Sequence, residues 1–154
     1  MSGTDAENAK SYVLVQIGDR RFALPASEVS ELAPPVRLHQ FPHNSSLVSG
    51  IIVRRGRLVP VYDVCSLLTG KGSPAHQFYL VARRHFESAS EPAAIPVNGD
   101  SELVTADTVQ VTSPAYVSGR LMHGGESIEV LDLDRLVAFE SRKKNQVDYA
   151  GLNS

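Results

Sequence analysis

The feature that most constrains the fold is a duplicated stretch of sequence. Residues 47–68, LVSGIIVRRGRLVPVYDVCSLL, return as residues 116–137, YVSGRLMHGGESIEVLDLDRLV, with matched positions always 69 apart and no gap. A run of in-register matches indicates a repeated supersecondary unit. We therefore expect two related strand–turn–strand units, one in each of two similar small β-barrels. The identical pairs include Gly50 and Gly119, Gly56 and Gly125, and Asp63 and Asp132.

Each repeated residue type has a structural role in such a unit. The glycine before the first strand permits close backbone approach or a bulge, and the glycine in the turn permits a positive φ. Asp63 and Asp132 resemble a general acid–base pair when taken alone. Each, however, follows the same strand of its own unit. This repetition favours capping of the next turn over catalysis.

Short strands and frequent turns continue along the rest of the chain. Residues 25–32 predict only a helical turn or two, and Pro96 within its apolar run predicts an edge strand or a bulge. The expected fold class is mostly β, with one or two short helices. Further strands are predicted near 12–17, 22–25, 77–84, 93–97 and 102–111. We expect a disordered lead (1–11), one domain (12–137) and a polar C-terminal helix or tail (138–154).

Composition narrows the class of protein. The chain has 154 residues and a net charge of −2, which argues against a nucleic-acid partner because such proteins normally present a basic face. The one cysteine, Cys65, excludes an intramolecular disulfide and lies among apolar residues, as a small core residue would. The first residues contain no apolar segment typical of a signal peptide, and no apolar run is long enough to insert into a membrane. We expect a cytoplasmic protein.

The central unit resembles the signature of a known family. Bacterial chemotaxis coupling proteins, the CheW-like domains, carry a stretch similar to G-[VI]-I-N-x-R-G-x-x-[VLI]-P-V-x-D-[LV]. The stretch FALPASEVSEL, at 22–32, and the closing repeat, at 116–137, resemble the first and last segments of the family in the right order. The resemblance covers roughly residues 12–137. The residues that match the central signature are Gly50, Ile51, Ile52, Arg55, Gly56, Val59, Pro60, Val61 and Asp63.

The resemblance implies both a fold and a function. The implied fold is two five-stranded, SH3-like β-barrels packed side by side. The implied function is that of a non-catalytic adaptor, without cofactor or metal, that binds the cytoplasmic tip of a chemoreceptor (methyl-accepting chemotaxis protein) near the groove between the barrels. Other surfaces would bind the regulatory domain of a CheA-type histidine kinase and other CheW-like proteins.

The sequence also departs from the family pattern. Val53 and Arg54 replace the usual asparagine and apolar residue, and AAIPVNGDSELV, at 93–104, lacks the usual glycine and Val-Asp of the third quarter. A barrel strand could be missing or short there. The alternative function is therefore an accessory adaptor that binds a receptor but has lost kinase coupling through an altered second barrel (85–105).

The arginine turn at 54–57 is the first candidate for a partner contact. Arg54 and Arg57 suit a solvated hairpin turn, which also discourages edge-to-edge aggregation. Arg55 occupies the position of the family's arginine, and its planar guanidinium suits a carboxylate or helix carbonyls on a receptor tip. Apolar candidates for a binding groove flank the motif: Val29, Leu47, Val48 and Ile52, with Leu32 beside them. Each is equally compatible with an ordinary core position.

Other functional classes are poorly supported. His39 and His43 have a ligand-like spacing, but no cysteine or carboxylate cluster accompanies them, so we expect no metal site. No nucleophile elbow or phosphate-binding glycine loop is present, so we expect no catalytic residue and no cofactor. A single-stranded nucleic-acid binder would need a basic groove with exposed aromatic residues. We therefore favour an adaptor over an enzyme or a nucleic-acid protein.

Overall fold

The computed structural model describes residues 9–40, 48–72, 78–86, 89–99 and 101–139. Leu47, His43 and most of the expected lead and tail lie outside the described residues. The expected start of the domain, residue 12, falls two positions inside the first strand, which begins at Lys10.

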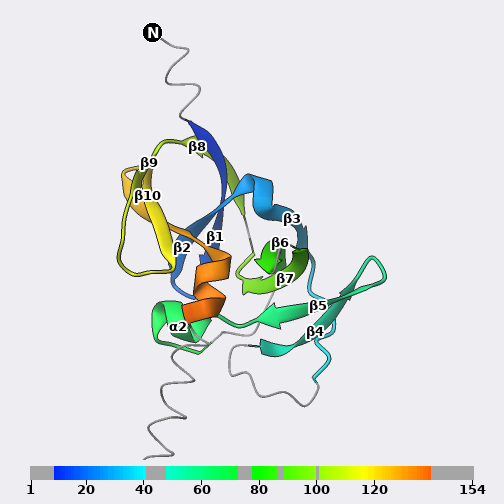
Figure 1. The fold of residues 1–154 in the computed structure, drawn as a ribbon. Coiled ribbons are helices and arrows are strands. Elements are labelled where there is room, and N and C mark those ends of the chain that lie inside the picture. The colour runs from blue at the N-terminus through cyan, green and yellow to red at the C-terminus, as the bar shows by residue number, and fades with distance from the viewer. Residues whose placement is uncertain (1–8, 41–47, 73–77, 87–88, 100, 140–154) are drawn as a thin grey trace, which may run out of the picture.

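The described chain is mostly β, as predicted, and forms two sheets (Figure 1). The first has six strands in the order β8-β1-β2-β11-β10-β9: Glu102–Ala106, Lys10–Ile17, Arg20–Pro25, Glu126–Leu131, Val117–His123 and Thr108–Gln110. The second has five strands in the order β3-β6-β7-β5-β4: Val29–Ala33, Phe78–Phe86, Ala89–Val97, Arg57–Tyr62 and Val48–Arg54. The short helical elements are η1 (Ala26–Glu28), α2 (Cys65–Thr69) and residues 133–139. The first sheet has one strand more than the five expected, because the strand predicted near 102–111 is divided into β8 and β9.

Each sheet encloses its own apolar core. We call the six-stranded sheet with its core barrel A and the five-stranded sheet with its core barrel B. A third and larger cluster, which includes Phe22, Leu80, Ile95 and Leu136, joins the two barrels. This cluster buries apolar surface of both barrels where they meet. The core of barrel A is formed by Tyr12, Leu14, Ala23, Val104, Leu121, Ile128 and Val130, and that of barrel B by Ala33, Ile52, Val59, Val61, Tyr79, Val81 and Ala94.

The duplicated stretch forms the same hairpin in both barrels, as predicted. In β4 and β5, Gly50 pairs with Val61, and in β10 and β11, Gly119 pairs with Val130. The register shift that marks a bulge lies next to the glycine in both hairpins. Three core positions are also equivalent at the same separation of 69: Ile52 and Leu121, Val59 and Ile128, and Val61 and Val130.

A second repeat, which we did not detect from sequence, completes the symmetry. The hairpin β1-β2 pairs in parallel with β11, and the hairpin β6-β7 pairs in parallel with β5. The strand after each hairpin then crosses to the other barrel, since β3 pairs with β6 and β8 pairs with β1. Each barrel therefore combines a hairpin from one half of the chain with strands from the other half: β1-β2 with β8–β11 in barrel A, and β6-β7 with β3–β5 in barrel B. The trace of this repeat in the sequence is the short word Ser-Glu-Leu, at 30–32 and again at 101–103.

The structure corrects four expectations for local structure. The strand expected to be missing or short is β7, which has nine residues and pairs with β6 along its whole length. Pro96 lies in this central strand rather than at an edge, and the only β7 residue that pairs with β5 is Ala94. Residues 85–105 do not belong to one barrel, because β7 lies in barrel B and β8 in barrel A. The helical turns expected near 25–32 are limited to η1, and Val29 already lies in β3.

Candidate partner-binding surfaces

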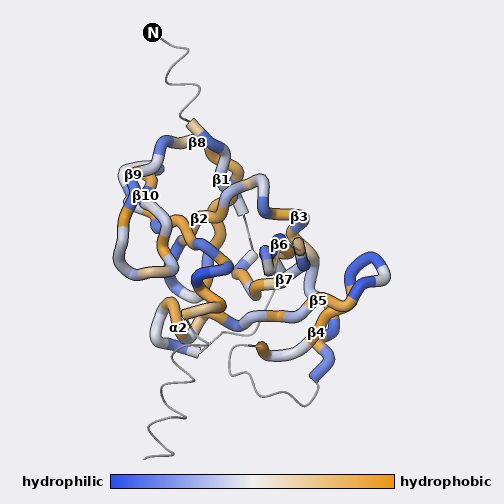
Figure 2. Tube along the Cα trace, in the orientation of Figure 1, coloured by the Kyte–Doolittle hydropathy of each residue, from blue (hydrophilic) through white to orange (hydrophobic). Residues whose placement is uncertain are grey.

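The hairpin β4-β5 projects from barrel B and ends in the arginine turn. Its tip is hydrophilic, in contrast to the apolar strands behind it (Figure 2). Arg55 and Gly56 both have positive φ, 52° and 74°. Two consecutive residues of positive φ form the type I′ turn that suits the twist of a two-residue hairpin. Arg55 is 82% exposed and adopts this conformation without a glycine's freedom.

The turn is attached to the neighbouring strand β3 through one carboxylate. Arg54 donates a hydrogen bond from Nε to Oε1 of Glu31 at 2.9 Å, and Arg55 donates from Nε to Oε2 at 3.1 Å. The hydrogen bond from Arg54 is the main reason why the pKa of Glu31 lies below its ordinary value. We expected Arg54 to be a solvated turn residue. Instead it connects β4 to β3 through its hydrogen bond to Glu31.

The outer face of this hairpin is apolar. Ile51 pairs with Pro60 and Val53 with Leu58, so two apolar cross-strand pairs follow one another. Leu58 is 68% exposed and Val53 47% exposed, so this face presents adjacent apolar side chains to solvent. The surface that consists of these two pairs, with Arg55 and Arg57 at its tip, is here called the hairpin surface.

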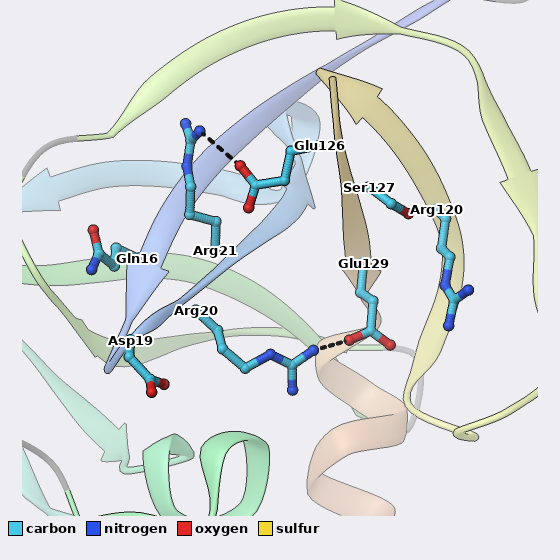
Figure 3. A pocket seen from close by; sticks show the side chains of 8 residues that line it. All are labelled: Gln16, Asp19, Arg20, Arg21, Arg120, Glu126, Ser127 and Glu129. Atoms are coloured by element: carbon cyan, nitrogen blue, oxygen red, sulfur yellow. Dashed lines mark hydrogen bonds and ion pairs between the residues drawn. The ribbon is translucent and has the colours of Figure 1, made fainter. Parts of the chain in front are cut away.

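Barrel A is more polar at the corresponding place, although Met122 is 63% exposed there. The residues that replace the two apolar pairs are Arg120 with Glu129 and Met122 with Ser127. Figure 3 shows the resulting cleft of about 520 Å³, across which Arg20 pairs with Glu129 and Arg21 with Glu126. The apolar hairpin surface is thus a property of barrel B and not of the repeated unit.

A second apolar surface lies on barrel A, where Val13 of β1 pairs with Leu103 of β8. The equivalent pair in barrel B is Leu80 with Leu32; Leu80 is buried in the shared core and Leu32 is half-buried against it. Val13 is only half-buried, and Leu103 is 69% exposed. The symmetry therefore breaks at one apolar pair, here called the Val13–Leu103 seat, which borders the shared core and is open to solvent.

The predicted partner residues are distributed unevenly. Arg55 is exposed on the hairpin surface. Val29 and Val48 are half-buried against the shared core, and Leu47 lies outside the described residues. Ile52 is fully buried in barrel B, so we remove it from the candidate surface. Sequence reasoning missed Leu58, Val53 and Leu103. The repeated Ser-Glu-Leu relates Leu103 to Leu32 but does not indicate which of the two is exposed.

The predicted structural residues occupy geometrically demanding positions. A Cβ on Gly50 would lie 2.7 Å from the carbonyl oxygen of His39, and one on Gly119 would lie 3.0 Å from that of Val109. Gly56 and Gly125 both have positive φ in their turns, and Pro60 lies in β5 opposite Ile51. Asp63 accepts a hydrogen bond from the amide of Cys65 at 3.3 Å, and Asp132 accepts one from that of Arg135 at 3.1 Å.

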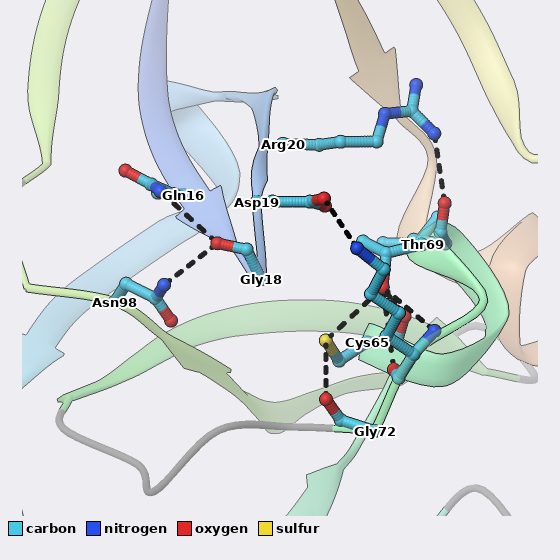
Figure 4. A network of polar contacts seen from close by, with 10 residues as sticks. Gln16, Gly18, Asp19, Arg20, Cys65, Thr69, Gly72 and Asn98 are labelled. Carbon is cyan, nitrogen blue, oxygen red and sulfur yellow. Dashed lines mark hydrogen bonds and ion pairs between the residues drawn. The ribbon is translucent and has the colours of Figure 1, made fainter.

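Polar contacts connect α2 and the residues that follow it to the turn between β1 and β2 in barrel A (Figure 4). Arg20 donates to the carbonyl oxygen of Leu68 at 2.9 Å, and Lys71 pairs with Asp19 at 3.3 Å. Cys65 is buried, with its Sγ 3.6 Å from Oγ1 of Thr69. Among the described residues, no group of three or more His, Cys, Asp or Glu side chains could hold a metal ion. None of the helices in the described part of the chain has the length and apolar character needed to cross a membrane.

Two intertwined β-barrels with exposed apolar surfaces define a protein of the interaction-module class. Residues 11–98 match the family model for the CheW-like domain. The chain belongs to the CheW-like family, whose members are non-catalytic scaffold proteins of chemotaxis-type signalling.

Two further similarities agree with this family. Over 70 residues the chain is 34% identical to protein PilI of Pseudomonas aeruginosa; the aligned region is 46% of this chain and 39% of PilI. The crystal structure of the scaffolding protein TtCheW from Thermoanaerobacter tengcongensis superposes with a TM-score of 0.68 and 21% identity, over 82% of this chain and 91% of that one. The latter similarity concerns the fold.

Proposed function

We propose that this protein is a cytoplasmic adaptor of a bacterial chemosensory system, which binds the helical cytoplasmic tip of a chemoreceptor and couples it to a CheA-type histidine kinase. The observation that carries the proposal is the presence of two separate apolar surfaces on an otherwise filled two-barrel fold. Two surfaces allow one molecule to hold two partners at once, which is what coupling requires.

The Val13–Leu103 seat suits the receptor tip. It lies beside the shared core, where the two barrels meet, and the equivalent pair in barrel B is covered by the protein itself. An apolar spot of this size accommodates one or two anchor residues on the apolar face of a helix. Leu103 is the centre of this contact, because it is the most exposed member of the pair.

The hairpin surface suits a folded partner such as the kinase regulatory domain. Its apolar pairs supply area that a partner can desolvate, and Arg55 supplies a planar, charged group at the edge of that area. Glu31 holds the guanidinium of Arg55 in place before a partner arrives, which lowers the entropy lost on binding.

The structure removes the main reason for the alternative, an accessory adaptor without kinase coupling. It depended on a missing or short strand near residues 85–105, but β7 is nine residues long and fully paired with β6. The hairpin surface also lies in barrel B, away from the charged cleft of barrel A. We retain the alternative as an outcome of the binding experiment below.

The experiment measures binding of the purified protein to a receptor cytoplasmic fragment and, separately, to the kinase. Leu103→Glu should weaken receptor binding at least tenfold and leave kinase binding intact, and Leu58→Glu should do the opposite. Matched controls are Val109→Glu, another exposed apolar residue of barrel A, and Ser127→Glu, which occupies the position of Leu58 in barrel A. Receptor binding without kinase binding by the unmodified protein would support the alternative. If the unmodified protein binds neither the receptor fragment nor the kinase, the proposed function is overturned.

A further inference from the structure

The two barrels carry equivalent carboxylates with different partners. Glu31 of β3 and Glu102 of β8 are the central residues of the two Ser-Glu-Leu words. Glu31 accepts hydrogen bonds from Arg54, the last residue of β4. Glu102 instead contacts His123, the last residue of β10, with 3.3 Å between Oε1 and Nε2. Because Arg54 and His123 are 69 positions apart, they are the same residue of the repeat, occupied once by arginine and once by histidine.

These contacts span the open seam of each sheet. In barrel B, β3 and β4 are the two outer strands. His39 forms a main-chain bridge to Ile51 of β4, and the contact between Arg54 and Glu31 joins β4 to β3 beyond that bridge. In barrel A, the outer strands are β8, which pairs with β1, and β9, which pairs with β10 only at Gly119–Leu121. His123 lies beyond that pairing, and its contact with Glu102 connects β8 to the end of β10.

The two contacts respond differently to pH. A guanidinium stays charged throughout the physiological range, whereas an imidazole is the side chain that gains its charge between about pH 8 and pH 5. The charged groups around His123 come from three strands. Glu102 (β8) is its partner, Glu126 (β11) lies opposite it in the hairpin, and Arg21 (β2) contacts Glu102 at 3.2 Å and Glu126 at 3.6 Å. With a neutral imidazole, only Arg21 supplies a positive charge to Glu102 in this network.

We propose that His123 and Glu102 form a pH-sensitive clasp on β8, which closes the seam of barrel A when His123 is protonated and thereby regulates binding at the Val13–Leu103 seat. Leu103 directly follows Glu102 in β8, so ordering of this outer strand orders the seat. The regulatory part of the inference rests on the proposed receptor function, whereas the clasp itself belongs to the free protein. Barrel B, with Arg54 in the same position, is closed at every physiological pH.

The clasp is tested on the free protein by amide hydrogen exchange, corrected for the intrinsic effect of pH. Protection of the β8 amides that pair with β1 should rise about two- to fivefold from about pH 8 to about pH 5.5. His123→Gln should abolish this rise, and His123→Arg should give high protection at both pH values. The barrel B control, Arg54→His, should create a pH dependence in β3 that the unmodified protein lacks. If the protection of β8 in the unmodified protein does not change with pH, and His123→Gln behaves in the same way, the proposal is overturned.

Regulation is tested by measuring receptor-fragment affinity at the same two pH values. Binding about two- to fivefold tighter at the lower pH, and independent of pH in His123→Arg, supports regulation. Equal affinity of the unmodified protein at both pH values, together with pH-dependent protection of β8, would overturn the regulatory part and leave the clasp. No binding at either pH, with the protection data as expected, would overturn the proposed receptor function instead.

Discussion

Ser49 and Ser118 donate the same hydrogen bond in the two barrels, from Oγ to the carbonyl oxygens of Val61 and Val130, each at 3.5 Å. Both serines lie at the bulge of their hairpin, where the register shifts beside a glycine. A bulge bends its strand and increases the local twist. The bend helps each hairpin curve around its own core. The two barrels therefore share their irregularities as well as their regular pairing.

The first prediction concerns the close backbone approach at Gly50. A Cβ at this position would lie 2.7 Å from the carbonyl oxygen of His39 and 2.8 Å from Cδ1 of Leu38, so Gly50→Ala must displace main chain. We expect a loss of about 1–3 kcal/mol in the free energy of unfolding, measured with urea. Gly72→Ala is the matched control, because no atom of the described residues lies within 4 Å of its Cβ and its φ is not positive. Equal stability of the two variants would contradict the prediction.

The second prediction uses the pKa of Glu31, which its hydrogen bond from Arg54 lowers. A carboxyl group with a lower pKa in the folded state stabilises the fold above its unfolded pKa, and this contribution is lost as the pH falls through the folded pKa. Glu31→Gln should therefore cost about 0.5–1 kcal/mol near neutral pH, and the difference from the unmodified protein should vanish in acid. Chemical unfolding at neutral and at acidic pH checks this. A difference that does not change with pH would show that Glu31 acts through packing alone.

The third prediction separates Arg55 from Arg54. Arg55 is 82% exposed and makes one contact to Glu31 from its Nε, so Arg55→Glu should leave the melting temperature nearly unchanged and weaken partner binding. Arg54 is more enclosed and joins β4 to β3, so Arg54→Ala should lower the melting temperature by a few degrees. A collapse of the fold in Arg55→Glu would show that this arginine is structural.

The sequence revealed only one of the two repeats, and the reason is physical. The stretches 47–68 and 116–137 keep their glycines and aspartates, because a bulge, a turn and a cap each require particular residue types. The hairpins β1-β2 and β6-β7 need only apolar residues that point inward, and many residues satisfy that requirement. Leu14 and Val81, or Val104 and Ala33, are therefore equivalent in space with little identity in sequence.

The candidate surfaces were harder to predict than the fold. Periodicity places Ile52 and Leu58 in strands but does not say which apolar residue faces a core and which faces solvent when the turn register is unknown. Leu32 and Leu103 stand in the same three-residue word, yet only Leu103 is exposed, since exposure depends on what packs against each strand. The turn at 54–57 predicts a solvated Arg54. The sequence does not indicate its partner, Glu31, because that residue is distant in the chain.

The fourth prediction concerns Glu28, whose pKa is raised by burial and, to a smaller extent, by the charges of Asp132 and Asp134. A carboxyl group with a raised pKa in the folded state lowers the stability of the fold as the pH rises from its unfolded pKa to its folded pKa. The full penalty applies above the folded pKa, because the group then carries its charge where charge is disfavoured. Glu28→Gln should raise the free energy of unfolding at neutral pH by about 0.5 kcal/mol, and the gain should disappear below the ordinary carboxyl range. Loss of stability at neutral pH would contradict this sign.

The last prediction uses a place where the barrels differ in volume. In barrel B, Val36 and Leu38 pack against the core, with Leu38 beside Gly50. The equivalent neighbour of Gly119 in barrel A is Thr108, which lines a cleft of about 590 Å³ together with Tyr12. Thr108 is shorter than Leu38, so the space that Leu38 fills in barrel B is part of the cleft in barrel A.

Exchange of these residues tests whether the two places are equivalent. Leu38→Thr should cost about 1–2 kcal/mol, less than the full range for a leucine truncation because Leu38 is only half-buried. Thr108→Leu should add about 0.5–1 kcal/mol by filling part of the cleft. Thr105→Leu, on the exposed face of β8, is the control for a general effect of added apolar surface. Destabilisation by Thr108→Leu would show that the cleft differs from the barrel B core in shape as well as in occupancy, because overpacking, and not an empty volume, would then set the energy.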